Sequence, residues 1–247
     1  MTSMPPPTSA PPLPATHYMP PESWPNYDHI ITEDGKPVDG LYDEKQMRFL
    51  TSVLYDSWPG PGDNRPFLAT ANVGLFYSFR EPPIVPDVML SLDIRIGDQR
   101  EKKHRSYFVW EHGKGPEAAI EIVSGTDGEE LGNKRRIYAQ IGVPYYIVWD
   151  PRLILGKEPL RCFILRGRTY KKNGTWFPDI GLGVTVWKGE FEGWEKQWLR
   201  WCDKEGKVLP IGAERVAQEK QRAEREKQRA EKLAEKLRSL GIDPNQP

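Results

Sequence analysis

The chain has 247 residues, and its 35 Lys and Arg balance its 35 Asp and Glu, which provides no overall positive field for nonspecific nucleic-acid binding. A locally basic groove remains compatible with this balance. The two cysteines, Cys162 and Cys202, form no CxxC pair, and the four histidines show no paired spacing, which argues against a disulfide framework and a zinc site. We see no signal peptide and no apolar run long enough for a membrane span, so we expect a soluble cytoplasmic protein with no membrane partner.

The first part of the chain differs in composition from the rest. Residues 1–26 are rich in proline and poor in aliphatic side chains. Such a segment buries too little surface to offset its ordering entropy, so we expect a disordered arm. We expect one globular domain over residues 27–211.

Hydrophobic periodicity predicts the elements of this domain. Its first half should begin with a helix at 43–55, strands at 68–79 and 88–92, and a charged loop at 97–105. A buried strand at 118–123, a turn at 125–128, a helix at 129–141 and a short apolar strand at 145–149 should follow. Gly142 and Pro144 should end the second helix. Strand, helix and strand at this spacing predict a right-handed crossover between parallel strands. Shorter strands at 161–165 and 184–187, and a hairpin of 198–202 with 207–209, complete an α/β fold with a mixed α+β sheet and a β-rich second half.

The tail, residues 212–241, should form one long charged helix, followed by a disordered end at 242–247. It contains a seven-residue repeat, 219–225 followed by 226–232. One heptad position holds Val216, Ala223, Ala230 and Leu237. Its companion position holds Glu219, Glu226, Leu233 and Leu240. This half-charged seam specifies a coiled coil only weakly, so we expect an exposed helix with some self-association.

Three residues indicate a phosphodiesterase site. Asp87 begins a predicted strand, Glu121 lies within an apolar strand, and Lys134 follows in the next helix. Two carboxylates can hold Mg²⁺, with Mn²⁺ as the alternative, and a lysine can steady the attacking water and the phosphate charge. Alternation puts Glu121 on one face with Ala119 and Val123, where an unpaired glutamate would be costly.

Each of the three residues has an ordinary interpretation when taken alone. Asp87 can belong to a turn, Glu121 can face solvent, and Lys134 can lie on a helix surface. Lys134 should lie five residues into its helix, ~8 Å along the axis, within reach of the strand end. Their order favours the site. Glu44 is a further candidate acid, although a surface position is its simpler interpretation.

The motifs around the triplet resemble the Uma-two family of endonucleases. They are Glu81–Val88, Arg105–Glu111, Glu121–Ser124, Leu131–Tyr146 and Val148–Pro151, and the resemblance spans about Asp34 to Leu209. It implies the PD-(D/E)xK nuclease fold, a mixed central sheet with flanking helices. It also implies that Asp87 and Glu121 are the motif metal ligands.

The chain departs from the family pattern at some positions. The motif lysine would fall at position 123, which is Val123, and the resemblance implies that Lys134 replaces it. The turn after the glutamate is Ser124-Gly125-Thr126-Asp127, where the family has Ser-Pro-Ser-Thr. Asn133 replaces an acidic residue, and Glu130 stands where the family commonly has aspartate. None of these changes removes a core ligand.

We therefore expect a metal-dependent DNA endonuclease. One alternative is a catalytically inactive nucleic-acid-binding or scaffolding protein with the same fold. Another is an interaction protein that works through its C-terminal helix. A homodimer, through the core or that helix, would supply one site per DNA strand.

Overall fold

The computed structural model describes Ser23 and residues 40–97, 100–124 and 130–239. The predicted proline-rich arm, apart from Ser23, and the 242–247 end lie outside the described residues. The centre of the molecule is a six-stranded mixed sheet, in agreement with the mixed central sheet that the resemblance implies. Its strands, in spatial order, are β1 (Phe67–Ala71), β3 (Val88–Leu92), β5 (Ala118–Ile122), β6 (Tyr145–Trp149), β7 (Leu160–Arg166) and β8 (Thr169–Asn173).

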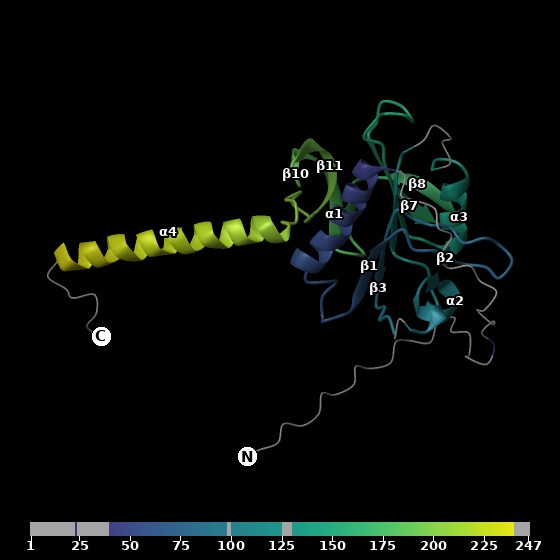
Figure 1. Ribbon diagram of the computed structural model, residues 1–247, viewed down its shortest axis with the longest axis horizontal. Helices are drawn as coiled ribbons and strands as arrows, with labels where there is room; N and C mark the ends of the chain where they lie inside the picture. The colour runs from purple at the N-terminus through teal and green to yellow at the C-terminus, as the bar shows by residue number, and fades with distance from the viewer. Residues whose placement is uncertain (1–22, 24–39, 98–99, 125–129, 240–247) are drawn as a thin grey trace, which may run out of the picture.

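The two faces of the sheet have different covers (Figure 1). Helix α1 (Leu41–Ser57) and a three-stranded sheet pack on the face that carries Val88, Ile120 and Ile122. That smaller sheet consists of β9 (Trp176–Phe177), β10 (Leu182–Phe191) and β11 (Trp194–Cys202). Helix α3 (Asn133–Ile141) lies on the other face, which carries Met89 and Ala119. The middle strands are buried along their whole length on both faces, and all their residues except Ser91 and Glu121 are apolar.

The predicted crossover is present, with β5 and β6 parallel and in register from Ala118↔Tyr145 to Ile122↔Trp149. Helix α3 connects them and ends at Gly142, whose φ of 88° lies in the left-handed region that glycine tolerates. The predicted start of this helix was wrong. It begins at Asn133, because Gly132, with φ −103° and ψ −104°, is not helical. Lys134 therefore lies in the first turn of α3, not five residues into it.

Other boundaries also differ from the prediction. The expected strand 68–79 is two strands, β1 and β2 (Leu75–Phe76), because the chain turns at Asn72, which has a φ of 53°. Strand β2 pairs in parallel with β4 (Tyr107–Phe108), which precedes the short helix α2 (Val109–His112). The predicted loop 97–105 contains a 3₁₀ turn, η2 (Lys102–His104), and the predicted turn 125–128 lies outside the described residues.

The predicted hairpin of 198–202 with 207–209 is present as one antiparallel bridge between Cys202 and Val208, with backbone bonds from Asp203 N–H to the Lys207 carbonyl and from Leu209 N–H to the Trp201 carbonyl. The main partner of β11 is instead β10, in register from Gly183↔Cys202 to Phe191↔Trp194. The predicted strand 184–187 covers only the middle of β10. The turn from β10 to β11 at Glu192, which has a φ of 48°, was not predicted.

Helix α4 (Gly212–Ser239) has no buried residue and projects away from the body (Figure 1). Its first turn is attached through Glu214, whose carboxylate accepts bonds of 2.9 and 2.6 Å from Arg200. Burial opposes ionisation of Glu214, but Arg200 and the Ile211 N–H outweigh it and lower its pKa. Arg200 lies over the rings of Phe49 and Trp187. None of the helices in the described part of the chain has the length and apolarity needed to cross a bilayer.

Candidate active site

The pairing of β3 with β5 brings Asp87 and Glu121 to the same place. The register Val88↔Ile120 puts Asp87, just before β3, opposite Glu121. The Ile122 N–H donates to Asp87 Oδ2 at 2.5 Å. Residues opposite each other in an antiparallel pair project from the same face, with Cβ atoms about 4.5–5.5 Å apart. Both carboxylates therefore belong to the face covered by α3.

Helix α3 supplies a partner for each oxygen of Glu121, which is fully buried. Lys134 Nζ donates to Oε2 at 2.7 Å, and the Tyr138 hydroxyl donates to Oε1 at 2.5 Å. These two donors are four residues apart and so lie on one face of the helix. The structure thus brings together all three residues of the predicted triplet.

Charges in this cluster act on one another. Burial raises the pKa of Glu121, against the opposing effects of Lys134 and Tyr138. Burial would lower the pKa of Lys134, but Glu121, Asp87 and Glu130 outweigh it and raise this pKa. Lys134 therefore keeps its proton at neutral pH and provides a fixed positive charge beside the two acids.

Two residues of this cluster were not predicted as functional. In the predicted helix 129–141, the hydrophobic pattern counts Tyr138 as an apolar residue on one face with Leu131 and Ile141, although its spacing from Lys134 could have indicated a second polar contact. Glu130 precedes α3, and its charge is close enough to raise the pKa of Glu121. Its Oε2 atom is buried and has no hydrogen-bond partner among the residues that the structure describes. This orphaned oxygen gives the site an additional acceptor.

The residues fit a hard divalent cation that keeps part of its water shell. Mg²⁺ prefers oxygen ligands and is commonly held by one or two carboxylates. Within the described ranges, no group of three or more His, Cys, Asp or Glu is placed to hold a metal ion, so the two carboxylates would have to hold it together with water. An ionised carboxylate has about four acceptor positions, and Glu121 uses two of them for Lys134 and Tyr138. Glu121 therefore retains acceptor positions for such an ion, beside the Asp87 carboxylate.

Lys134 lines an open cleft of about 740 Å³. One wall is the segment 81–85, and the other is α3, with Lys134, Arg136 and Gln140. Its volume is in the range of ligand sites, and it is open to a larger substrate. The cleft gives a phosphate group access to the lysine side of the cluster.

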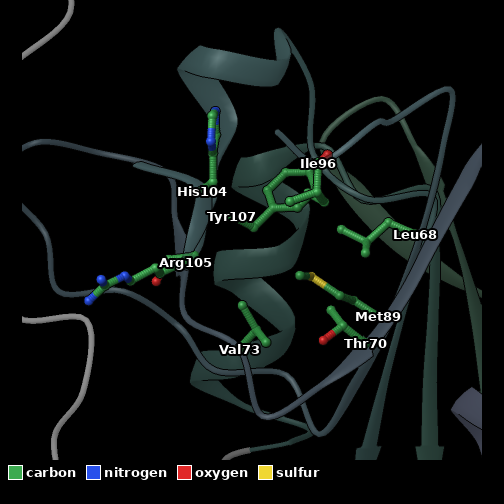
Figure 2. Close-up of a pocket in the computed structure, with 9 residues that line it drawn as sticks. Leu68, Thr70, Val73, Met89, Ile96, His104, Arg105 and Tyr107 are labelled. Carbon is green, nitrogen blue, oxygen red and sulfur yellow. The ribbon is translucent and has the colours of Figure 1, made fainter. Parts of the chain in front are cut away.

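A second cavity on the same face of the sheet is not next to a lysine–carboxylate cluster (Figure 2). It measures about 120 Å³, and Leu68, Met89 and Tyr107 converge on it, whereas Arg105 points away. The volume is below the roughly 300 Å³ of small ligand sites, and none of the described residues that line it carries a carboxylate. The cleft at Lys134 is the better candidate for a substrate site.

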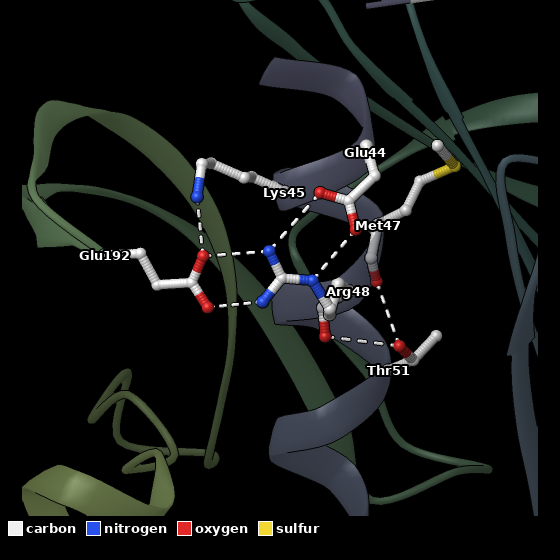
Figure 3. A network of polar contacts seen from close by, with 6 residues as sticks. All are labelled: Glu44, Lys45, Met47, Arg48, Thr51 and Glu192. Carbon is white, nitrogen blue, oxygen red and sulfur yellow. Dashed lines mark hydrogen bonds and ion pairs between the residues drawn. The ribbon is translucent and has the colours of Figure 1, made fainter. Parts of the chain in front are cut away.

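Glu44 does not join the acidic cluster. It lies on α1, which covers the opposite face of the sheet. Its carboxylate accepts a 2.8 Å bond from Arg48, which also pairs with Glu192 at the turn between β10 and β11 (Figure 3). Lys45 bonds the same Glu192 at 2.6 Å. Glu44 therefore belongs to a surface network that joins α1 to the small sheet.

Tyr138→Phe is expected to reduce the free energy of unfolding by about 1–3 kcal/mol, because it leaves a buried carboxylate oxygen unpartnered. The matched control is Tyr170→Phe, whose hydroxyl donates to the Val143 carbonyl at 2.6 Å. Loss of that neutral bond should cost about 1 kcal/mol. Urea unfolding of both variants measures the difference, and equal losses would contradict the assigned importance of the Tyr138–Glu121 bond.

Comparison with known proteins assigns the chain to a family. A protein-family model described as "Putative restriction endonuclease" matches residues 34–176. The match includes Asp87, Glu121 and Lys134 and ends before β10, earlier than the expected end near Leu209. No curated protein matches the chain. Because the model covers more than half of the 247 residues, the chain belongs to the Uma2 family of putative restriction endonucleases.

Proposed function

We propose that this protein is a divalent-metal-dependent DNA endonuclease that hydrolyses phosphodiester bonds. The observation that carries the proposal is the 2.7 Å contact of Lys134 with Glu121, beside Asp87 and at the cleft. In this proposal Asp87 and Glu121 hold Mg²⁺ or Mn²⁺. The bound ion would supply Lewis acidity and a more acidic water.

The protein's own groups have separate tasks in this proposal. Tyr138 fixes the orientation of the Glu121 carboxylate from within the core. Lys134, 27% exposed and cationic, presents its charge to a phosphate oxygen entering the cleft and steadies the attacking water. Arg136 lines the same cleft and is suited to a neighbouring phosphate.

One observation favours a second function, an inactive nucleic-acid-binding or scaffolding protein with this fold. Both Glu121 oxygens already have protein donors, so the ion pair can satisfy the buried acid without a metal. In that case the cluster would stabilise the fold and bind no cation. The two functions therefore differ in metal binding as well as in cleavage.

Supercoiled-plasmid cleavage, together with metal titration by calorimetry, distinguishes the endonuclease from the inactive protein. The endonuclease proposal expects nicked plasmid with Mg²⁺ or Mn²⁺ and none with EDTA. Early linear product would indicate two sites acting together, as in a homodimer. Absence of both cleavage and metal binding would overturn the proposal and favour the inactive protein.

A further inference from the structure

Helix α4 carries a regular stripe of positive charge along one side. Its residues are Arg222, Arg225, Arg229, Lys232 and Lys236. They are spaced by three and four residues in alternation, the spacing that keeps side chains on one helix face. At 100° per residue they fall within an arc of about 80°. At 1.5 Å per residue they extend over about 21 Å. We call these five residues the cationic stripe.

The basic residues of α4 beyond its first turn lie on two opposite sides of the helix. The other basic residues beyond its first turn are Lys220, Lys227 and Arg238, which lie on the far side of the helix. Lys220 and Lys227 have Glu224 and Glu231 four residues later, the spacing of helical ion pairs. In the stripe, by contrast, Arg225 and Arg229 are four residues apart, as are Lys232 and Lys236. Like charges at this spacing destabilise a helix by about 0.2–0.5 kcal/mol per pair. Glu226 and Glu235 lie three residues from Arg229 and Lys232 and offset part of this repulsion in the isolated helix.

The cationic stripe is available to a partner. All five residues are exposed, and α4 buries none of its side chains. Arg222 pairs with Glu226 at 3.1 Å, an exposed contact of little energy. Within the described ranges, no ion pair joins an acid to Arg225, Arg229, Lys232 or Lys236. The first turn of α4, in contrast, is fixed to the core through Glu214 and through Arg215, which donates to the Asp56 carbonyl.

We propose that the cationic stripe binds the phosphate backbone of duplex DNA and that α4 is a DNA-holding arm attached to the nuclease body. Complementary charge selects this partner, because neighbouring stripe cations are about 4.5–6 Å apart along the axis and can follow a row of phosphates. The inference extends the proposed function, but it concerns binding alone and is independent of cleavage.

The test compares two triple variants of the full chain that remove equal charge. One is Arg225→Gln/Arg229→Gln/Lys232→Gln in the stripe, and the control is Lys220→Gln/Lys227→Gln/Arg238→Gln on the far side. Glutamine is a good helix former, and circular dichroism checks that α4 persists. Binding of a labelled 30-base-pair duplex is measured by anisotropy at several salt concentrations, in EDTA, so no cleavage enters.

The stripe variant should lose about 2–3 from the slope of log affinity against log salt, roughly one for each lost phosphate contact, and should bind about tenfold or more weakly. The control should stay close to wild type. Equal effects in both variants, or none, would overturn the proposal. So would tighter binding of wild type to anionic vesicles or to a polyglutamate peptide than to DNA. A protein that fails to cut plasmid but shows the stripe-specific loss would refute only the nuclease function.

Discussion

Glu121→Gln is expected to lower metal-dependent plasmid cleavage by at least about a thousandfold, which corresponds to ~4 kcal/mol of transition-state stabilisation. The amide keeps the size of the side chain and still accepts from Tyr138. It removes the negative charge that would hold the cation, and, with its single oxygen accepting from Tyr138, it turns its N–H₂ donor toward the Lys134 ammonium. Both metal affinity and the position of the lysine should therefore change. Single-turnover cleavage and calorimetric metal titration measure the two effects.

The control for this variant is Glu117→Gln, just before β5. Glu117 accepts from the Leu92 N–H at 2.7 Å and pairs with Lys114, away from the Asp87–Glu121 cluster. This change removes the same charge from the same region and should leave cleavage within about twofold, because the altered side chain does not reach the site. A folded Glu121→Gln protein that cuts as fast as the Glu117→Gln protein would contradict our assignment.

Lys134→Met is expected to lower the free energy of unfolding by about 3 kcal/mol and to abolish cleavage. Methionine fills similar space but leaves the fully buried Glu121 with one neutral donor and no counter-charge. Breaking one side of a buried ion pair costs about 3–5 kcal/mol, and the partial exposure of Lys134 puts the effect at the lower end. Urea unfolding measures the loss.

A double variant separates stability from activity. Glu121→Gln/Lys134→Met removes both charges together, so it should recover most of the lost stability while remaining inactive. Lys114→Met, which breaks the more exposed pair with Glu117, should cost less than about 1 kcal/mol. If the double variant were less stable than Lys134→Met, the buried charge would not be the source of the loss.

The sequence predicted the centre of the fold well because β3, β5 and β6 are continuous apolar runs, and Glu121 stands out in one of them. Alternation also assigned Glu121 to the face shared with Ala119, where the structure has it. The edge was harder to predict. Strand β8, with the sequence TYKKN and mostly exposed side chains, carries little hydrophobic signal, and its pairing with β7 comes from backbone hydrogen bonds.

The site was predicted only in part, for a related reason. Hydrophobic periodicity counts Tyr138 as a residue of the apolar face of α3 and takes no account of its hydroxyl, although that hydroxyl has a specific partner in Glu121. The start of α3 depends on the backbone angles of Gly132, which hydrophobic pattern does not encode. Glu130 was noted only as a variation on a family motif. Its buried, unpartnered oxygen depends on the tertiary packing around it.

The two contacts from α3 to a single carboxylate have a consequence for local unfolding. A helix of nine residues is too short to be stable in water by itself, so α3 depends on its attachment to the sheet. Lys134 and Tyr138 make part of that attachment, and both bonds break when the helix opens. Local unfolding of α3 therefore also removes Lys134 and Tyr138 from Glu121. Slow hydrogen exchange of the α3 amides therefore reports, without any substrate, the fraction of molecules whose site is assembled.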